Sequence, residues 1–132
     1  MIVDSSVIVA ILAREVDSEQ FAIAIANEAS CKISVANFLE VGIVLSGRDV
    51  PIWSAPIDLF LERAQIEIVP ISVTQGYLAR EAHYRFGKRT GHPAKLNFGD
   101  CMCYALAKEL DEPLLFKGND FSETDVRIAY TP

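Results

Sequence analysis

The sequence lacks the features of several specialised protein classes. It has no apolar run of the ~18 residues that a membrane-spanning helix needs, and no basic, apolar leader precedes Asp4. Only three of its 132 residues are cysteine, which excludes a disulfide scaffold and favours a reducing, cytoplasmic setting. With 7 glycines and 6 prolines, it is not collagen-like either.

Signatures of several common sites are missing as well. Cys101 and Cys103 are two positions apart on a predicted helix, and Cys31 has no cysteine or histidine companion. A zinc site is therefore not expected. The sequence also contains neither a Walker phosphate loop nor a glycine-rich dinucleotide fingerprint.

What the chain has is apolar material in an alternating pattern. Hydrophobic residues make up 51% of it, which excludes disorder and predicts one domain over residues 1–132. Strands are expected at residues 1–3, 32–34, 67–71 and 114–116, with a last strand at 126–130. Helices are expected at residues 7–12, 18–28, 35–45, 56–65, 74–86 and 99–110. The alternation predicts an α/β fold with a short, mainly parallel central sheet.

Charge is distributed unevenly along the chain. The net charge of −6 argues against a nucleic-acid-binding protein, which usually carries a basic excess. The segment from Arg80 to Lys95, however, holds five of the twelve cations and both histidines, with Glu81 as its single acid. This basic segment is either a solvated loop or a phosphate-binding surface.

Two acidic residues are only partly explained by ordinary structural roles. Asp4 follows the first strand and can cap the next helix, although Ser5 or Ser6 can do so equally well. Glu40 lies on a helix that is apolar almost all round, with no cation three or four positions away. A buried carboxylate at that position needs a pair, a metal ion or a proton.

Two further acids gain meaning from their position. Asp100 begins a helix, where the dipole favours an acid, and Asp120 follows a turn. Asp4 and Asp120 both follow strands that are expected to be parallel, so they point to one edge of the sheet. Carboxylates gathered there repel one another unless a cation lies between them. Oxygen ligands suit Mg²⁺ or Mn²⁺, and the matching chemistry is phosphodiester cleavage.

Four sequence motifs carry a resemblance to a known family. They are Ile2-Val3-Asp4-Ser5-Ser6, Asn37-Phe38-Leu39-Glu40, Leu96-Asn97-Phe98-Gly99-Asp100-Cys101 and Leu114-Leu115-Phe116-Lys117-Gly118-Asn119-Asp120-Phe121. In this order and spacing the chain resembles the PIN-domain ribonucleases, most closely the VapC-like toxins of bacterial type II toxin–antitoxin pairs. The resemblance covers nearly the whole chain.

The resemblance implies a PIN-like three-layer α/β/α sandwich and a Mg²⁺-dependent endoribonuclease, with Mn²⁺ as the alternative ion. The family's acidic quartet falls on Asp4, Glu40, Asp100 and Asp120, with Asp4 and Asp100 most directly on the metal and Ser6 in a supporting role. It further implies a cytoplasmic toxin that arrests growth by cleaving RNA, forms a homodimer and is neutralised by a cognate antitoxin, without a membrane partner.

The resemblance also assigns the basic segment, which leads directly into Asp100. Its cations are expected to contact RNA phosphates and so supply the affinity that the total charge opposes. The candidate residues are Arg85, Lys88, Arg89 and Lys95. His83 and His92 are interpreted as surface or RNA-contacting residues rather than catalytic bases.

Other functions remain as alternatives. One is a PIN-type RNA-processing nuclease that is not a toxin, and another is a non-catalytic binding module. A phosphatase of the haloacid-dehalogenase type also places an aspartate after its first strand, but it needs a second one where this chain has Ser6. The region of Trp53 and Phe60 is open to three interpretations, as core, dimer face or antitoxin groove.

Overall fold

The computed structural model describes residues 1–48 and 54–129, and a four-stranded parallel sheet lies at its centre. The strands are β1 (Ile2–Val3), β2 (Cys31–Ser34), β3 (Ile66–Val69) and β4 (Leu114–Leu115), in the spatial order β3-β2-β1-β4. All three neighbouring pairs are parallel, with Ile2 of β1 opposite Lys32 of β2 and Leu114 of β4. The parallel α/β sheet predicted from the sequence is therefore confirmed.

Six helices connect the strands. They are α1 (Ser5–Leu12), α2 (Ser18–Ala26), α3 (Val35–Ser46), α4 (Ser54–Arg63), α5 (Val73–Phe86) and α6 (Phe98–Leu110). Each overlaps a predicted helix. Helix α1 begins two residues earlier than predicted because Asp4, rather than a serine, is its N-cap. None of these helices is long and apolar enough to span a bilayer.

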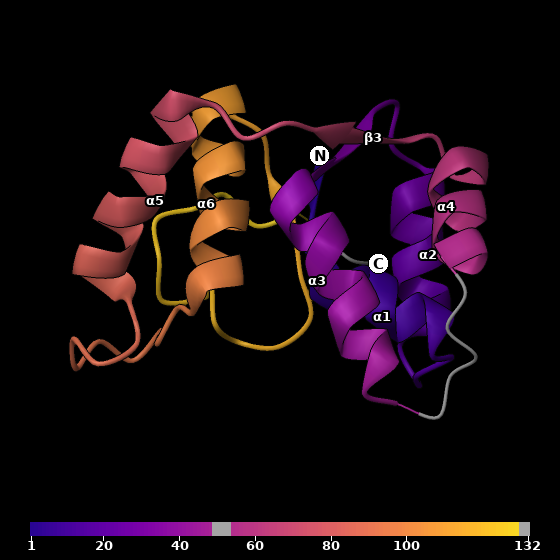
Figure 1. The fold of residues 1–132 in the computed structure, drawn as a ribbon, viewed down its shortest axis with the longest axis horizontal. Coiled ribbons are helices and arrows are strands. Elements are labelled where there is room, and N and C mark those ends of the chain that lie inside the picture. The colour runs from indigo at the N-terminus through magenta and orange to yellow at the C-terminus, as the bar shows by residue number, and fades with distance from the viewer. Residues whose placement is uncertain (49–53, 130–132) are drawn as a thin grey trace.

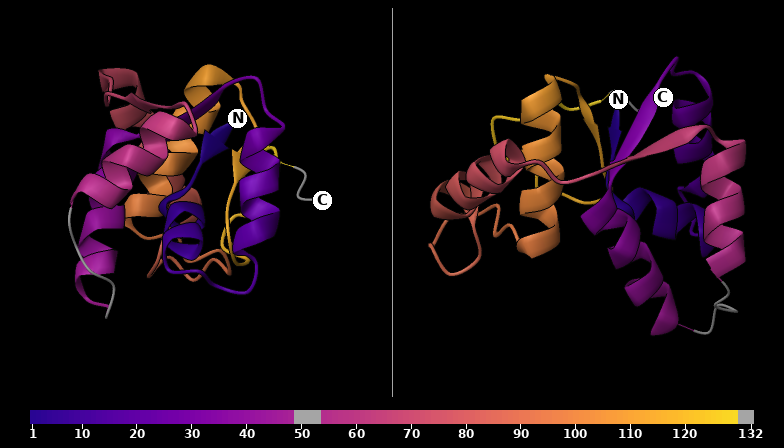
Figure 2. Two further views of the ribbon diagram at one scale, coloured as in Figure 1. Left: turned by 90° about the vertical axis from the view of Figure 1, so that its right-hand side faces the viewer. Right: turned by 45° about the horizontal axis from the view of Figure 1, so that its top comes forward.

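The helices cover both faces of the sheet, which gives three layers (Figures 1 and 2). Because neighbouring residues of a strand point to opposite faces, β1 and β4 each contribute a buried residue to two cores. Val3 and Leu115 pack with side chains from α1, α2, α3 and α4. Ile2 and Leu114 pack with side chains from α5 and α6 on the other face. The observed arrangement is the predicted α/β/α sandwich.

The predicted strand at residues 126–130 is not formed in the part of it that the structure describes. Ile128 makes only an isolated parallel bridge to Leu114, although Ala129 still donates a backbone hydrogen bond of 2.8 Å to the carbonyl of Leu114. Pairing with β4 is limited to this one position, where Leu114 also donates a backbone hydrogen bond of 2.8 Å to the carbonyl of Arg127. Tyr130 and Trp53, which the sequence analysis singled out, lie outside the described residues.

Helix α3 is less buried than its apolar sequence suggests. Val41 and Leu45 are in the core, but Leu39 and Ile43 on another face are 63% and 61% exposed. The helix follows β2 without a loop because Ser34 ends the strand and also caps the helix, accepting a hydrogen bond from the backbone of Ala36. The first turns of α3 are thereby held at the carboxyl edge of the sheet.

The order of the strands places a change of direction between β1 and β4. The chain passes from β1 outward to β2 and β3, and then returns through α5 and α6 to β4 on the other side of β1. In open parallel sheets, ligands bind outside the carboxyl ends of the strands at such a switch point. Asp4 directly follows β1 there, and Asp120 lies five residues beyond β4.

Candidate active site

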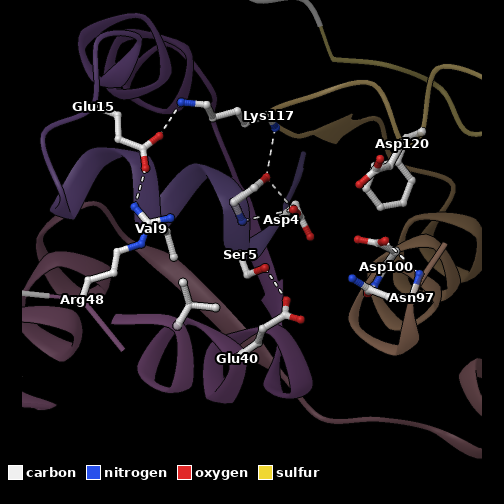
Figure 3. Close-up of a pocket in the computed structure, with 13 residues that line it drawn as sticks. Asp4, Ser5, Val9, Glu15, Glu40, Arg48, Asn97, Asp100, Lys117 and Asp120 are labelled. Atoms are coloured by element: carbon white, nitrogen blue, oxygen red, sulfur yellow. Dashed lines mark hydrogen bonds and ion pairs between the residues drawn. The ribbon is translucent and has the colours of Figure 1, made fainter. Parts of the chain in front are cut away.

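A cavity of about 320 Å³ opens at this switch point, between α1, α3 and α6. All four acids predicted for the site line it, although they come from four separate parts of the chain: Asp4, Glu40, Asp100 and Asp120. Figure 3 shows Asp4, Asp100 and Asp120 around the same space, with Glu40 below them. The structure therefore brings the whole predicted quartet together.

Asp4 is held rigidly by the start of α1. Its Oδ2 accepts hydrogen bonds from the backbone nitrogen of Ser6 at 3.1 Å and from Ser6 Oγ at 2.5 Å. Its Oδ1 is buried and has no hydrogen-bond partner among the described residues. Burial raises the pKa of Asp4, against the hydrogen bonds from Ser6, and the charge of Glu40 adds to the rise. One oxygen thus serves the helix, and the other is left for a ligand.

Asp100 is fixed by a capping box at the start of α6. Its backbone nitrogen donates to Asn97 Oδ1 at 2.9 Å, and the backbone nitrogen of Asn97 donates back to Asp100 Oδ2 at 3.0 Å. Burial raises the pKa of Asp100 to about 7, the hydrogen bond from Asn97 lowers it, and the charges of Asp4, Asp120 and Glu40 raise it further. A capping role alone favours the ionised form, so burial, with the neighbouring acids, sets this carboxyl apart from an ordinary cap.

Glu40 points from α3 toward the other acids, and hydroxyl and amide groups surround it. Its Oε1 accepts a hydrogen bond from Ser5 Oγ and a longer one, of 3.4 Å, from Asn37 Nδ2. In the described part of the chain no lysine or arginine forms an ion pair with Glu40. The pairing partner that its apolar helix requires is therefore not a cationic side chain of those residues.

Asp120 is exposed in the loop after β4, and this loop is anchored to the first acid through Ser6. The backbone nitrogen of Lys117 donates a hydrogen bond of 3.0 Å to Ser6 Oγ, which in turn donates to Asp4. Ser6 thus connects the loop that carries Asp120 to the N-cap of α1. This connection gives physical content to the supporting role expected for Ser6.

The far side of the cavity carries cations that the sequence analysis missed. Lys117 Nζ donates a hydrogen bond to Glu15, and Arg48 donates one to Glu15 at 2.7 Å (Figure 3). Lys117 Nζ also donates to Asp17 at 2.9 Å. Lys117 stands in one of the four motifs, next to the turn before Asp120. No local pattern marks Arg48, because its contact with the cavity depends on how α3 packs.

The quartet fits a hard divalent cation. The ligand atoms are all carboxylate oxygens, two of the groups have raised pKa values, and Asp4 offers a buried oxygen with no partner in the described chain. Within residues 1–48 and 54–129 no three acid, cysteine or histidine side chains lie close enough together to hold a metal ion as they stand. Mg²⁺ usually keeps several water ligands and is bound through one or two carboxylates, so the spacing of the quartet is compatible with it.

The predicted RNA-binding cations are divided by the structure. Lys88 and Arg89 line a second cavity, of about 840 Å³ between α5 and α6, which adjoins the acidic one because Asn97 lines both. Arg85 instead forms ion pairs with Asp125 at 3.4 Å and Glu81 at 3.8 Å. Lys95 is exposed. The basic segment is therefore partly structural and partly available to a ligand.

Comparison with known proteins decides the family. The sequence matches the profile of the PIN domain over residues 1–127. The chain belongs to the PIN-domain family. It is 48% identical over 129 residues to ribonuclease VapC28 of Mycobacterium tuberculosis, covering 98% of this chain and 97% of the relative. It is 39% identical to ribonuclease VapC30 of the same organism over 132 residues, the full length of both.

These full-length matches place the chain in the VapC branch of PIN domains, a family of endoribonucleases that depend on a divalent metal ion. The PIN resemblance predicted from the motifs is confirmed, and a haloacid-dehalogenase fold is excluded. Among solved structures, the M. tuberculosis sarcin-ricin loop cleaving toxin VapC20 superposes with a TM-score of 0.79 at 15% identity, covering 99% of this chain and 98% of that one.

A toxin–antitoxin complex from Klebsiella pneumoniae superposes with a TM-score of 0.70, also at 15% identity, over 99% of this chain and 98% of that chain. At such low identity the two structural matches establish the fold, and they agree with the three-layer arrangement described above.

Proposed function

We propose that Asp4, Glu40, Asp100 and Asp120 hold Mg²⁺ in the acidic cavity and that the protein uses it to cleave RNA. The observation that carries this proposal is the buried Oδ1 of Asp4, which has no partner in the described chain and faces acids that lack ion pairs there. Mn²⁺ prefers the same oxygen ligands and is expected to replace Mg²⁺.

The chain's own residues divide the work according to how they are held. Asp4 and Asp100 are fixed by helix starts, so they present ligand oxygens with little freedom. A divalent ion held there would supply Lewis acidity and would make a water molecule easier to deprotonate. Glu40 is hydrogen-bonded through Oε1, which leaves Oε2 to orient a water and accept its proton. Asp120, exposed at the mouth, completes the set.

RNA is proposed to run from the acidic cavity toward the second cavity past Asn97. Lys88, Arg89 and Lys95 would contact phosphates along this path, and Arg85 would contribute less because Asp125 and Glu81 neutralise much of its charge. Phosphate contacts do not distinguish one base sequence from another, so they do not select the RNA that is cleaved.

The proposed physiological role is that of a cytoplasmic toxin. Its relatives are VapC ribonucleases, and one structure with the same fold is a toxin–antitoxin complex. A cognate antitoxin would then neutralise the protein, and a homodimer is proposed as its own state. Exposed apolar side chains such as Leu39, Ile43 and Tyr77 offer area for such contacts. Expression of the protein alone is expected to arrest growth. Co-expression with a small open reading frame that lies beside its gene should restore growth, and the two proteins should purify as a complex.

The decisive experiment is cleavage of a mixed RNA substrate by the purified protein in EDTA, in Mg²⁺ and in Mn²⁺. Cleavage is expected with either ion and absent in EDTA, and Asp4→Asn should abolish it because the buried ligand oxygen loses its charge. A protein that cuts RNA equally well in EDTA, or with Asn at position 4, would contradict the proposed metal site.

A further inference from the structure

We propose that Gly99 is a positioning residue for the carboxylate of Glu40 in the acidic cavity. It acts through the space left by its missing side chain, next to a hydrogen bond that Asn37 donates to the same carboxylate. The inference rests on the proposed function in one respect, since it assumes that Glu40 takes part in cleavage.

The carboxylate of Glu40 lies directly against the backbone of Gly99. A Cβ atom built at position 99 would be 2.2 Å from Glu40 Oε2, 2.7 Å from its Cδ and 2.8 Å from its Oε1. Those three atoms are the whole carboxylate group. Any side chain at position 99 must therefore push this carboxylate out of its present place. Glycine at this position therefore permits the close approach of α3, which carries Glu40, to the first turn of α6.

Asn37 holds the same carboxylate from its own helix. It is fully buried, and its Nδ2 donates to the carbonyl oxygen of Gly99 at 3.1 Å and to Glu40 Oε1 at 3.4 Å. One amide group thus ties α3 to the first turn of α6 and touches the carboxylate between them. Its Oδ1 is buried with no partner in the described residues, so the side chain is retained at a cost in desolvation.

These contacts predict that a substitution at position 99 can displace the carboxylate of Glu40 without lowering the stability of the protein. The atoms that a Cβ at position 99 would meet are the far end of a flexible side chain, which can rotate away without moving the backbone. Alanine is also the better helix former. Gly99→Ala should therefore keep or raise the melting temperature while it displaces Glu40. Displacement of a reacting group by about 1 Å can lower the rate roughly 10²-fold.

The test is a double-mutant cycle between positions 99 and 40. The variants are Gly99→Ala, Glu40→Asp and the two combined, with Gly42→Ala as a matched control on α3, where an added Cβ meets nothing within 4 Å. Three quantities are measured for each variant: the cleavage rate at saturating RNA, the affinity for RNA, and the Mg²⁺ concentration that gives half of the maximal rise in melting temperature. The last of these reports metal binding without catalysis.

Gly99→Ala is expected to lower kcat by about 10²-fold, with RNA affinity and folding unchanged and a higher Mg²⁺ requirement for thermal stabilisation. Aspartate is shorter by one methylene and withdraws from the added Cβ. Gly99→Ala should therefore have less than about a threefold further effect in the Glu40→Asp background. Gly42→Ala should cleave RNA at the wild-type rate.

Wild-type kcat in Gly99→Ala would overturn the inference. So would an equal loss in both backgrounds, since glycine would then act on something other than Glu40. Failure of Gly99→Ala to fold would also overturn it, because the conflict would lie with the backbone. Glu40→Gln separates the two proposals: full activity there refutes the assigned role of Glu40, whereas its inactivity beside a fully active Gly99→Ala refutes only the positioning.

Discussion

Two groups of acidic side chains in this molecule have opposite electrostatic surroundings. One group is neutralised by cations: Glu112 lies 2.6 Å from Lys32, and Asp125 lies 3.2 Å from Lys108. The quartet in the cavity has no ion pair within the described residues. The acids of the first group stabilise the folded state, whereas the unpaired acids of the second group destabilise it.

The pKa values follow this division. Hydrogen bonds from Lys117 and Arg48 lower the pKa of Glu15, and those from Tyr104 and Lys108 outweigh burial and lower the pKa of Asp125. Burial, with the neighbouring acids, raises the pKa of Asp100. Strongly perturbed groups of this second kind are typical of functional sites. A carboxylate therefore stabilises the protein where a cation neutralises it, and in the cavity it is left without such a partner among the described residues.

The largest difference between the two groups is expected when one acid from each is replaced by its amide. Asp100→Asn should lower RNA cleavage by orders of magnitude, since a charged ligand oxygen is lost. The amide oxygen can still accept the hydrogen bond from the backbone nitrogen of Asn97, and the metal-free melting temperature should rise because one of four mutually repelling acids is removed. Asp125→Asn should leave cleavage near the wild-type rate and lower stability by up to about 1 kcal/mol, because its ion pairs are partly exposed. Cleavage assays and thermal melts in EDTA check both.

Near-normal cleavage by a folded Asp100→Asn variant would contradict its proposed place on the metal. Strong loss of cleavage in Asp125→Asn would contradict the division into two groups, because that residue is assigned to the fold.

The pH dependence of stability should separate the two groups next. Asp100 has a pKa of about 7 in the folded protein and an ordinary value of 3.8, so metal-free stability should fall as pH rises through this interval, by up to about 4 kcal/mol. Asp4 contributes in the same direction. The lowered pKa of Glu15 acts oppositely, since its contribution is lost as pH falls below 4.5.

Urea unfolding of the wild type and of Asp100→Asn in EDTA, between pH 4 and pH 7, measures the difference. The free energy of unfolding should decline with pH more steeply in the wild type, and Mg²⁺ at pH 7 should restore it. Parallel curves for the two proteins would show that Asp100 keeps an ordinary pKa.

The smallest expected effects concern the cations, which divide in the same way as the acids. Replacing Lys88 and Arg89 with alanine should weaken RNA binding and reduce its salt slope by up to ~2, because two phosphate contacts are lost. Arg85→Ala should change the slope less and lower stability slightly, since Arg85 lies 3.4 Å from Asp125. Binding of an inactive variant to RNA at several salt concentrations provides the measurement.

If the salt dependence of RNA binding is unchanged in the double variant, other residues must make the phosphate contacts. Arg48 and Lys117, which line the acidic cavity, would then be the next cations to replace.

The local order of the elements was predictable because it depends on neighbouring residues. The alternation of strands and helices follows from hydrophobic period, and the acid after β1 and the capping box at Asp100 follow from a few consecutive residues. The position of Asp4 and Asp120 at one edge of the sheet followed from parallel strands, whereas Glu40 joined the quartet through the family resemblance. The family assignment rested on four short motifs, all of which can be read in sequence order.

The tertiary structure decided which side chains meet across long separations. Glu15 pairs with Lys117 at a distance of 102 residues in the sequence, and Asn37 reaches Gly99 across 62. Contacts of this kind depend on how α1, α3 and α6 pack, which no local pattern encodes. Packing also assigned Arg85 to Asp125 and reduced the predicted last strand to a single bridge. The sequence was enough to predict which four acids gather in the cavity, and the tertiary structure decided how each is held, because orientation depends on neighbours that are distant in the chain.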